Sequence, residues 1–88
     1  MTAGQQLTVF EIEASASSQT ILKLLNYFAL RDILPHKVAW CVSAGICQMK
    51  IETEHLTFEV AAVIAEKMRS QVNVSMVTLN RKRLNQDA

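Results

Sequence analysis

The side chains that could take part in chemistry are two histidines, two cysteines and a few glutamates. Catalysis needs such titratable groups to converge on one pocket. Cys41 and Cys47 lack the C-x2-C spacing of zinc and redox motifs. His36 follows Pro35 and His55 comes just before the second predicted helix, and a lone histidine is more typically a solvated surface residue than a general base or a ligand. We therefore expect a protein that is not an enzyme and that holds no metal or cofactor.

The glutamates fall into a strand pattern. Residues 7–13 alternate, with Phe10 and Ile12 on one face and Glu11 and Glu13 on the other. The two carboxylates are about 7 Å apart by strand rise, but the pattern offers them no acid partner in a pocket. We interpret them as solvated charges.

A helix follows this strand. The small residues 14–18 offer Ser17 or Ser18 as an N-cap, and apolar residues then recur at helical spacing from Gln19 to Ile33. Pro35 ends the helix, because the residue before a proline is pushed out of the helical region. The apolar residues that carry the helical period are Ile21, Leu24, Leu25 and Phe28.

A β-hairpin around the turn Ala44-Gly45 comes next. With a two-residue turn, one face is entirely apolar, and we expect it, with Trp40, to enter the core. Its pairs are Val38–Ile51, Trp40–Met49 and Val42–Cys47. The opposite face pairs Lys37–Glu52, Ala39–Lys50 and Cys41–Gln48, so opposite charges meet and the two cysteines point to opposite faces.

The remaining chain predicts a second helix from about His55 to Gln71 and a last strand from Val72 to Leu79. The helix carries an inner stripe of Val60, Ala61, Ile64 and Met68, and the strand alternates Val72, Val74 and Met76 with polar residues. The order strand, helix, strand, strand, helix, strand predicts an α+β, ferredoxin-like βαββαβ fold. Its four-stranded antiparallel sheet carries both helices on one face.

Length and composition agree with one small domain over residues 1–88, with an ordered core at about 6–79 and a polar tail at 80–88. Half of the residues are hydrophobic, 19% are charged and the net charge is +1. The start lacks a signal-peptide pattern and the longest apolar run, Val60 to Ala65, is too short for a membrane span. We expect a cytoplasmic protein with reduced cysteines and no membrane association.

Other users of this fold need residues that are absent at the corresponding sites. An acylphosphatase needs a cationic phosphate cradle, and a metallochaperone needs C-x-x-C, in the first strand–helix loop, where Ala14 to Ser18 offers neither. An RNA-recognition sheet needs aromatic residues on its open face, but Phe10 and Trp40 are predicted to face the helices. The basic cluster Arg81-Lys82-Arg83 reads as a solvated end, so nucleic-acid binding is not expected.

The first helix carries more apolar surface than one sheet can cover, since Leu22, Ala29 and Leu30 lie off its core stripe. Helices that are apolar nearly all round are buried against more than one partner. A small core also gains stability from oligomerisation. We expect a symmetric homodimer.

Over residues 6–79 the chain resembles an ACT-type regulatory domain. The resemblance is carried by the first helix, Ile21 to Ile33. Its residues Arg31-Asp32-Ile33 occupy the positions where the family typically has Arg-Gly-Phe. Similarity in length and in the single βαββαβ unit points to the short small subunits of acetohydroxyacid synthase, the thiamine-diphosphate enzyme of branched-chain amino-acid synthesis. Departures are a first loop without glycine, Asp32 in place of glycine, and Leu34 in place of Asn or His.

This resemblance implies that two copies pack together and bind an amino acid between the first loop of one chain and the start of the second strand of the other. Carried over by position, the candidate ligand residues are Ala16, Ser17, Ser18, Gln19, Leu34, Pro35 and His36. The resemblance also implies a large catalytic subunit, such as acetohydroxyacid synthase, as a partner that the module activates. The alternatives are a stand-alone amino-acid sensor and a ferredoxin-like RNA-binding domain.

Overall fold

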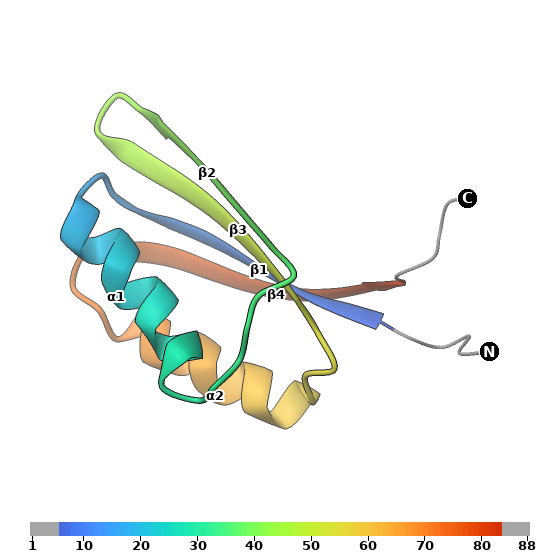
Figure 1. Ribbon diagram of the computed structural model, residues 1–88. Helices are drawn as coiled ribbons and strands as arrows, with labels where there is room; N and C mark the ends of the chain where they lie inside the picture. The colour runs from blue at the N-terminus through green and yellow to red at the C-terminus, as the bar shows by residue number, and fades with distance from the viewer. Residues whose placement is uncertain (1–5, 84–88) are drawn as a thin grey trace.

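The computed structural model describes residues 6–83. In chain order its elements are β1 (Gln6–Ser15), α1 (Ser18–Ala29), β2 (Lys37–Ser43), β3 (Ile46–Glu54), α2 (Phe58–Arg69) and β4 (Val74–Arg83). The strands form one antiparallel sheet in the order β2-β3-β1-β4, and both helices lie on one side of it (Figure 1). The predicted ferredoxin-like fold is confirmed.

The hairpin register is also confirmed, residue by residue, from Lys37 opposite Glu52 to Ser43 opposite Ile46. Its turn has φ of 52° at Ala44 and 79° at Gly45. Two consecutive left-handed residues make the turn whose twist matches that of the flanking strands. Because the side-chain period of a strand is two, this turn fixes the face of every hairpin side chain.

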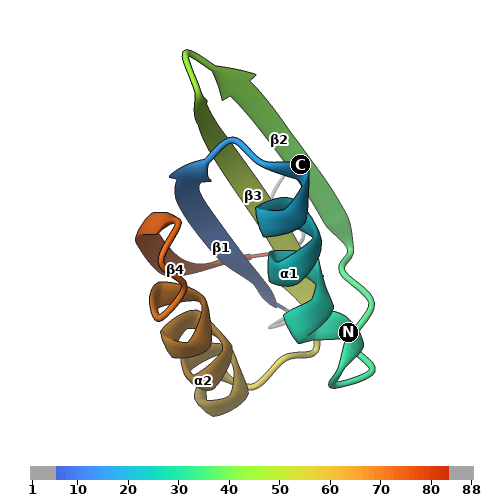
Figure 2. The same ribbon diagram turned by 90° about the vertical axis from the view of Figure 1, so that its left-hand side faces the viewer.

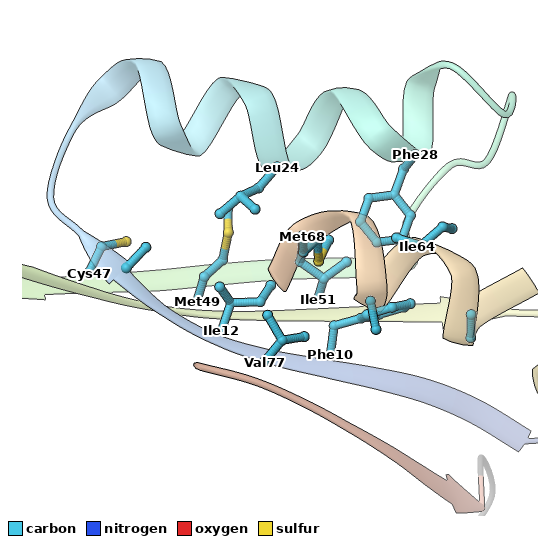
Figure 3. Close-up of a cluster of buried hydrophobic side chains, with 13 residues drawn as sticks. Phe10, Ile12, Leu24, Phe28, Cys47, Met49, Ile51, Ile64, Met68 and Val77 are labelled. Carbon is cyan, nitrogen blue, oxygen red and sulfur yellow. The ribbon is translucent and has the colours of Figure 1, made fainter. Parts of the chain in front are cut away.

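The core lies between the sheet and the two helices. Leu24 and Phe28 descend from α1 onto Ile12, Met49 and Ile51 of the central strands (Figure 3). Phe28 meets the ring of Phe10 edge-on, with centroids 5.1 Å apart, which is a favoured aromatic geometry. The α2 residues Ala61, Ile64, Ala65 and Met68 complete the buried cluster. The stripe predicted for α2 is thus confirmed, although Val60 is only partly buried.

Helix α1 is shorter than predicted, because it ends at Ala29 rather than at Ile33. The Ile33 N–H turns back to the Phe28 carbonyl at 2.9 Å, and the Asp32 N–H donates to Ala29 at 3.0 Å. This closure requires a left-handed residue, and Asp32 has φ of 57°. Asp is one of the few residues other than glycine that visits this region readily. Asp32, which the resemblance places where the family has glycine, thus has a left-handed φ that glycine adopts without steric cost.

Helix α2 begins at Phe58, three residues later than predicted, and ends at Arg69. Its N-cap is Thr57, whose hydroxyl accepts a hydrogen bond from the Val60 N–H at 3.2 Å. His55 cannot start the helix, because it has φ of 59°. A left-handed residue at that position turns the chain before the helix begins.

Strand β4 departs from its predicted alternation and length. Glu13 pairs with Met76, but its neighbour Ala14 pairs with Val74, so Ser75 is an extra residue. This β-bulge reverses the faces that follow it. Met76 is consequently on the open face and 52% exposed, while Val77 enters the core. The strand also runs to Arg83, which pairs with Gln6, where we expected a polar tail from residue 80.

Candidate functional site

The first group of candidate ligand residues, Ala16 to Gln19, lies at the N-terminal end of α1. Its approach is fixed by two backbone bonds, Ser15 N–H to Asn73 O and Ala16 N–H to Gly45 O, each 2.9 Å. Ser17 is the N-cap and has extended backbone angles, but its hydroxyl makes no capping hydrogen bond. The first-turn amides of a helix lack partners within the helix. This end of α1 therefore suits an oxygen of an anionic ligand.

The second group, Leu34, Pro35 and His36, lies in the connection from α1 to β2. Leu34 is 90% exposed. The His36 N–H donates to Glu52 O at 2.7 Å, and its Nδ1 lies 3.0 Å from Glu54 Oε2. His36 thus joins the connection to the end of β3, while Leu34 presents an uncovered apolar side chain.

One chain does not bring these two groups together. They lie at opposite ends of α1, a helix of 12 residues, which corresponds to about 18 Å of rise. The two best-formed cavities among the described residues are lined by none of the seven candidates. Within one chain the two groups are therefore separated by the length of α1.

The larger cavity, of about 510 Å³, lies instead on the open face of the sheet. All four strands line it, chiefly through Glu11, Glu13, Ala39, Cys41, Gln48, Lys50, Met76 and Thr78. Sequence reasoning placed Met76 elsewhere because the bulge at Ser75 leaves no clear signal in the sequence. Apart from Trp40, whose side chain belongs to the opposite face, none of these lining residues is aromatic, so the surface lacks the stacking platform of an RNA-recognition sheet.

Strand β2 forms one edge of the sheet, and its apolar face is largely uncovered. Figure 2 shows β2 on the side of α1 away from α2. Trp40 shares a face with buried Met49, as predicted, yet it is 51% exposed, and Val42 is 53% exposed. The expectation that Trp40 is a core residue is wrong, because α1 covers the central strands and leaves the edge strand open.

The opposite edge, β4, is covered in part by α2. Arg69 donates from Nη2 to the Val77 carbonyl at 3.0 Å, and its Nη1 pairs with Glu66. Arg69 thus satisfies an outward-facing carbonyl that would otherwise be open to another strand.

The titratable groups considered in the sequence analysis include two cysteines and two histidines. Cys41 is exposed and Cys47 is buried, on the opposite faces that the register predicted. Burial, with a smaller contribution from Cys41, raises the pKa of the Cys47 thiol and so keeps it protonated. His36 and His55 flank Glu54, at 3.0 and 3.8 Å. Within residues 6–83 no group of His, Cys, Asp or Glu has the arrangement of a metal site.

Within residues 6–83, no helix is both long enough and apolar enough to span a bilayer.

Comparison with known proteins gives one family. The family described as "ACT-like domain" matches residues 2–86. No curated protein matches the chain.

Solved structures share the fold at low sequence identity. The ACT domain from GTP pyrophosphokinase of Chlorobium tepidum has a TM-score of 0.74 at 12% identity, over 86% of this chain and 99% of that one. The C-terminal domain of MgtC from Mycobacterium tuberculosis has a TM-score of 0.71 at 10% identity, over 97% and 96%. A homoserine dehydrogenase from Thiobacillus denitrificans has a TM-score of 0.66 at 14% identity. There the match covers 94% of this chain but only 18% of the dehydrogenase.

Proposed function

The chain belongs to the ACT-like domain family, and on that premise we propose that it is a non-catalytic regulatory module that acts as a homodimer on a catalytic protein. The observation that carries this proposal is the separation of the candidate ligand residues. Ala16 to Gln19 and Leu34 to His36 lie at opposite ends of α1. Two chains packed side by side could supply one group each to a common site.

A small amino acid is the ligand that suits such a site. The uncapped N-terminal end of α1 favours a carboxylate, because its amides and the helix dipole both attract negative charge. The exposed side chain of Leu34 offers an apolar contact for the ligand's side chain. Binding across two chains would stabilise the dimer and shift the population of conformations of the protein to which the dimer is attached.

The catalytic partner that we propose is acetohydroxyacid synthase, for which this chain would be the small, activating subunit. Support for a catalytic partner of some kind comes from the shared fold. The domain of similar fold from Chlorobium tepidum comes from a GTP pyrophosphokinase, and the match in Thiobacillus denitrificans is a small part of a homoserine dehydrogenase. The choice of the synthase rests on the resemblance in length and first-helix sequence.

Sedimentation equilibrium, with and without valine, leucine and isoleucine, tests the module and its ligand. We expect a dimer that tightens with one of these amino acids. The variant Ala16→Asp should abolish the tightening, because it places a carboxylate at the position proposed for that of the ligand. Asn26→Asp is the matched control, since it adds a negative charge at an exposed position of α1 far from its N-terminal end.

The outcomes separate the possible functions. A dimer that ignores all three amino acids contradicts the sensing site and leaves a subunit that only docks and activates. Mixing the chain with the large synthase subunit from the same organism then tests activation, and unchanged activity and no complex contradict that partner. A monomer in every condition contradicts the proposed dimer.

A further inference from the structure

The cavity of about 510 Å³ on the open face of the sheet has no role in the proposed function. Its volume lies within the range of sites that hold small molecules. The residues of the proposed amino-acid site, Ala16 to Gln19 and Leu34 to His36, lie outside its lining. The cavity is therefore a second, separate candidate for ligand binding.

A β-bulge in β4 supplies an apolar part of the cavity lining. Glu13 pairs with Met76 whereas Ala14 pairs with Val74, so Ser75 is the extra residue. The Ser75 hydroxyl donates to the Glu13 carbonyl at 3.0 Å and holds the bulge against β1. Bulges are frequent next to functional sites, where they re-aim a side chain. This bulge places Met76 in the cavity, and a methionine thioether adapts to ligands of different shape.

The two glutamates of the cavity differ in what lies across the strands from them. Glu11 lies directly opposite Lys50 of β3. Cross-strand neighbours of opposite charge offset each other. Glu13, which is partly buried, lies instead between Gln48 of β3 and Met76 of β4. The charge of Glu11 is thus offset by a neighbouring strand, whereas the charge of Glu13 is not.

The other glutamates that alternate onto this face, Glu52 and Glu54, already have basic partners. Lys82 Nζ lies 3.7 Å from Glu52 Oε2, and His36 Nδ1 lies 3.0 Å from Glu54 Oε2. Within residues 6–83, Glu13 is therefore the open-face glutamate with no basic side chain opposite it or in ion-pair contact. Its carboxylate gives the cavity a negative charge that the chain does not offset.

We propose that this cavity binds a small organic cation, namely a primary ammonium or guanidinium group on a short apolar chain. The cationic group lies at the Glu13 carboxylate, where charge-assisted hydrogen bonds form. Gln48, opposite Glu13, adds an amide oxygen that accepts a further hydrogen bond. The apolar chain of the ligand lies along Met76. The inference goes beyond the proposed function and does not depend on the homodimer.

The charges of the lining also select against other ligands. An anion attracted to Lys50 meets Glu11 directly opposite that lysine, so little positive charge is left for it. A neutral apolar ligand removes water from Glu13 and gives its carboxylate no partner in return, which costs free energy. Lys50 repels a second positive charge, so the cavity favours cations with one charge.

Titration of the native chain with butylamine, followed by NMR shifts of the backbone amides, tests the inference. Butylamine is a cation at neutral pH, whereas 1-butanol is neutral and butyrate is an anion of similar size. We expect saturable shifts from butylamine in the segments that line the cavity, 11–13, 48–50 and 76–78. The other two compounds should bind at least about tenfold more weakly, because they form no charge-assisted hydrogen bond with Glu13.

Two pairs of variants identify the charges that act on the ligand. Glu13→Gln should weaken butylamine binding about fivefold, the upper range for a partly exposed ion pair. Glu59→Gln on α2 makes the same charge change away from the open face and should leave the dissociation constant unchanged. Lys50→Gln should tighten binding about twofold, because Glu11 then loses the opposite charge across the strands. Lys23→Gln on α1 is its control and should have no effect.

Several results overturn the inference. They are butylamine without saturable shifts, 1-butanol with the affinity of butylamine, and a folded Glu13→Gln with native affinity. Butylamine shifts confined to Ala16–Gln19 and Leu34–His36 would also overturn it, because the cation would then bind at the proposed amino-acid site. If Glu13→Gln does not fold, equal affinities of Lys50→Gln and Lys23→Gln overturn it instead. Sedimentation equilibrium tests the homodimer separately, so failure of the proposed function and failure of this inference are distinguishable.

Discussion

The two edge strands of the sheet, β2 and β4, differ in how far side chains from the helices cover them. Arg69 of α2 binds the outward carbonyl of Val77, and the Val77 side chain is 6% exposed. On β2, Trp40 and Val42 leave half of their side chains uncovered. Open strand edges invite pairing with other chains, and proteins usually shield them. The comparison teaches that α2 reaches the β4 edge through Arg69, whereas half of the Trp40 and Val42 side chains on the β2 edge stays uncovered.

The cause of the difference is the crossover topology. Helix α1 joins β1 to the outer strand β2, and α2 joins β3 to the outer strand β4, so each helix passes over a central strand. Whether an edge strand is covered then depends on whether the helix beside it carries a side chain long enough to reach that strand. Helix α2 ends in Arg69, whose long side chain reaches β4. Helix α1 has no basic residue in its last turn.

The largest effect that we predict concerns the proposed homodimer and the uncovered Trp40 of β2. Trp40→Ala should raise the dissociation constant of the dimer by a factor of about 30 or more, which is about 2 kcal/mol, because central tryptophans dominate such interfaces. Val63→Ala is the control, since Val63 is 47% exposed but lies on α2. Sedimentation equilibrium measures both. An unchanged dissociation constant for Trp40→Ala would place the dimer interface elsewhere.

A second prediction compares the loss of stability of the single chain when one valine of each edge strand is replaced by alanine. Val77→Ala should lower the free energy of unfolding by about 2 kcal/mol, because it removes two buried methyl groups and leaves a cavity. Val42→Ala should cost about 1 kcal/mol or less, because its side chain is already half exposed. Urea denaturation of both variants, at a protein concentration where sedimentation equilibrium shows only the monomer, measures the stability of the single chain. Equal losses would contradict the difference in coverage of the two edges.

The smallest predicted effect concerns Arg69, whose guanidinium binds the outward carbonyl of Val77 on β4. Arg69→Ala should lower the free energy of unfolding by about 1 kcal/mol, because the Val77 carbonyl loses a hydrogen bond from a charged donor whose side chain is half exposed. Lys67→Ala serves as the control, because Lys67 is the other basic residue in the last turn of α2. Thermal and urea denaturation measure the free energy of unfolding of both variants. If Arg69→Ala also forms higher oligomers, the Arg69 guanidinium is what keeps β4 from pairing with a strand of another chain. Equal stability and equal oligomeric state of Arg69→Ala and Lys67→Ala would contradict that role.

Much of the fold was predictable from the sequence, because the signals are local. The hairpin was predicted to the residue, since the turn Ala44-Gly45 and the period of two fix every pair. Helix ends were predicted less well. Asp32 and His55 take left-handed conformations that end α1 and delay α2, and neither residue type announces this as glycine would.

The candidate site was predictable only as a set of residues. Ala16 to Gln19 and Leu34 to His36 were chosen through a family resemblance, and whether they bind a ligand stays a prediction. Their positions at the two ends of α1 follow from the fold and keep the two groups apart within one chain. The open-face cavity was not predicted, because all four strands contribute to it and Met76 reaches it through a bulge.

The sequence by itself determined the order of the elements, the apolar stripes of both helices and the pairing of β2 with β3, because these depend on spacing along the chain and on neighbours across one short turn. Only the tertiary structure decided which apolar residues are buried. Trp40 and Met49 share a face and a register pair, yet one is 51% and the other 3% exposed. The physical reason is that burial depends on where a helix distant in sequence comes to rest. Helix α1 rests over the central strands and leaves the edge strand β2 open.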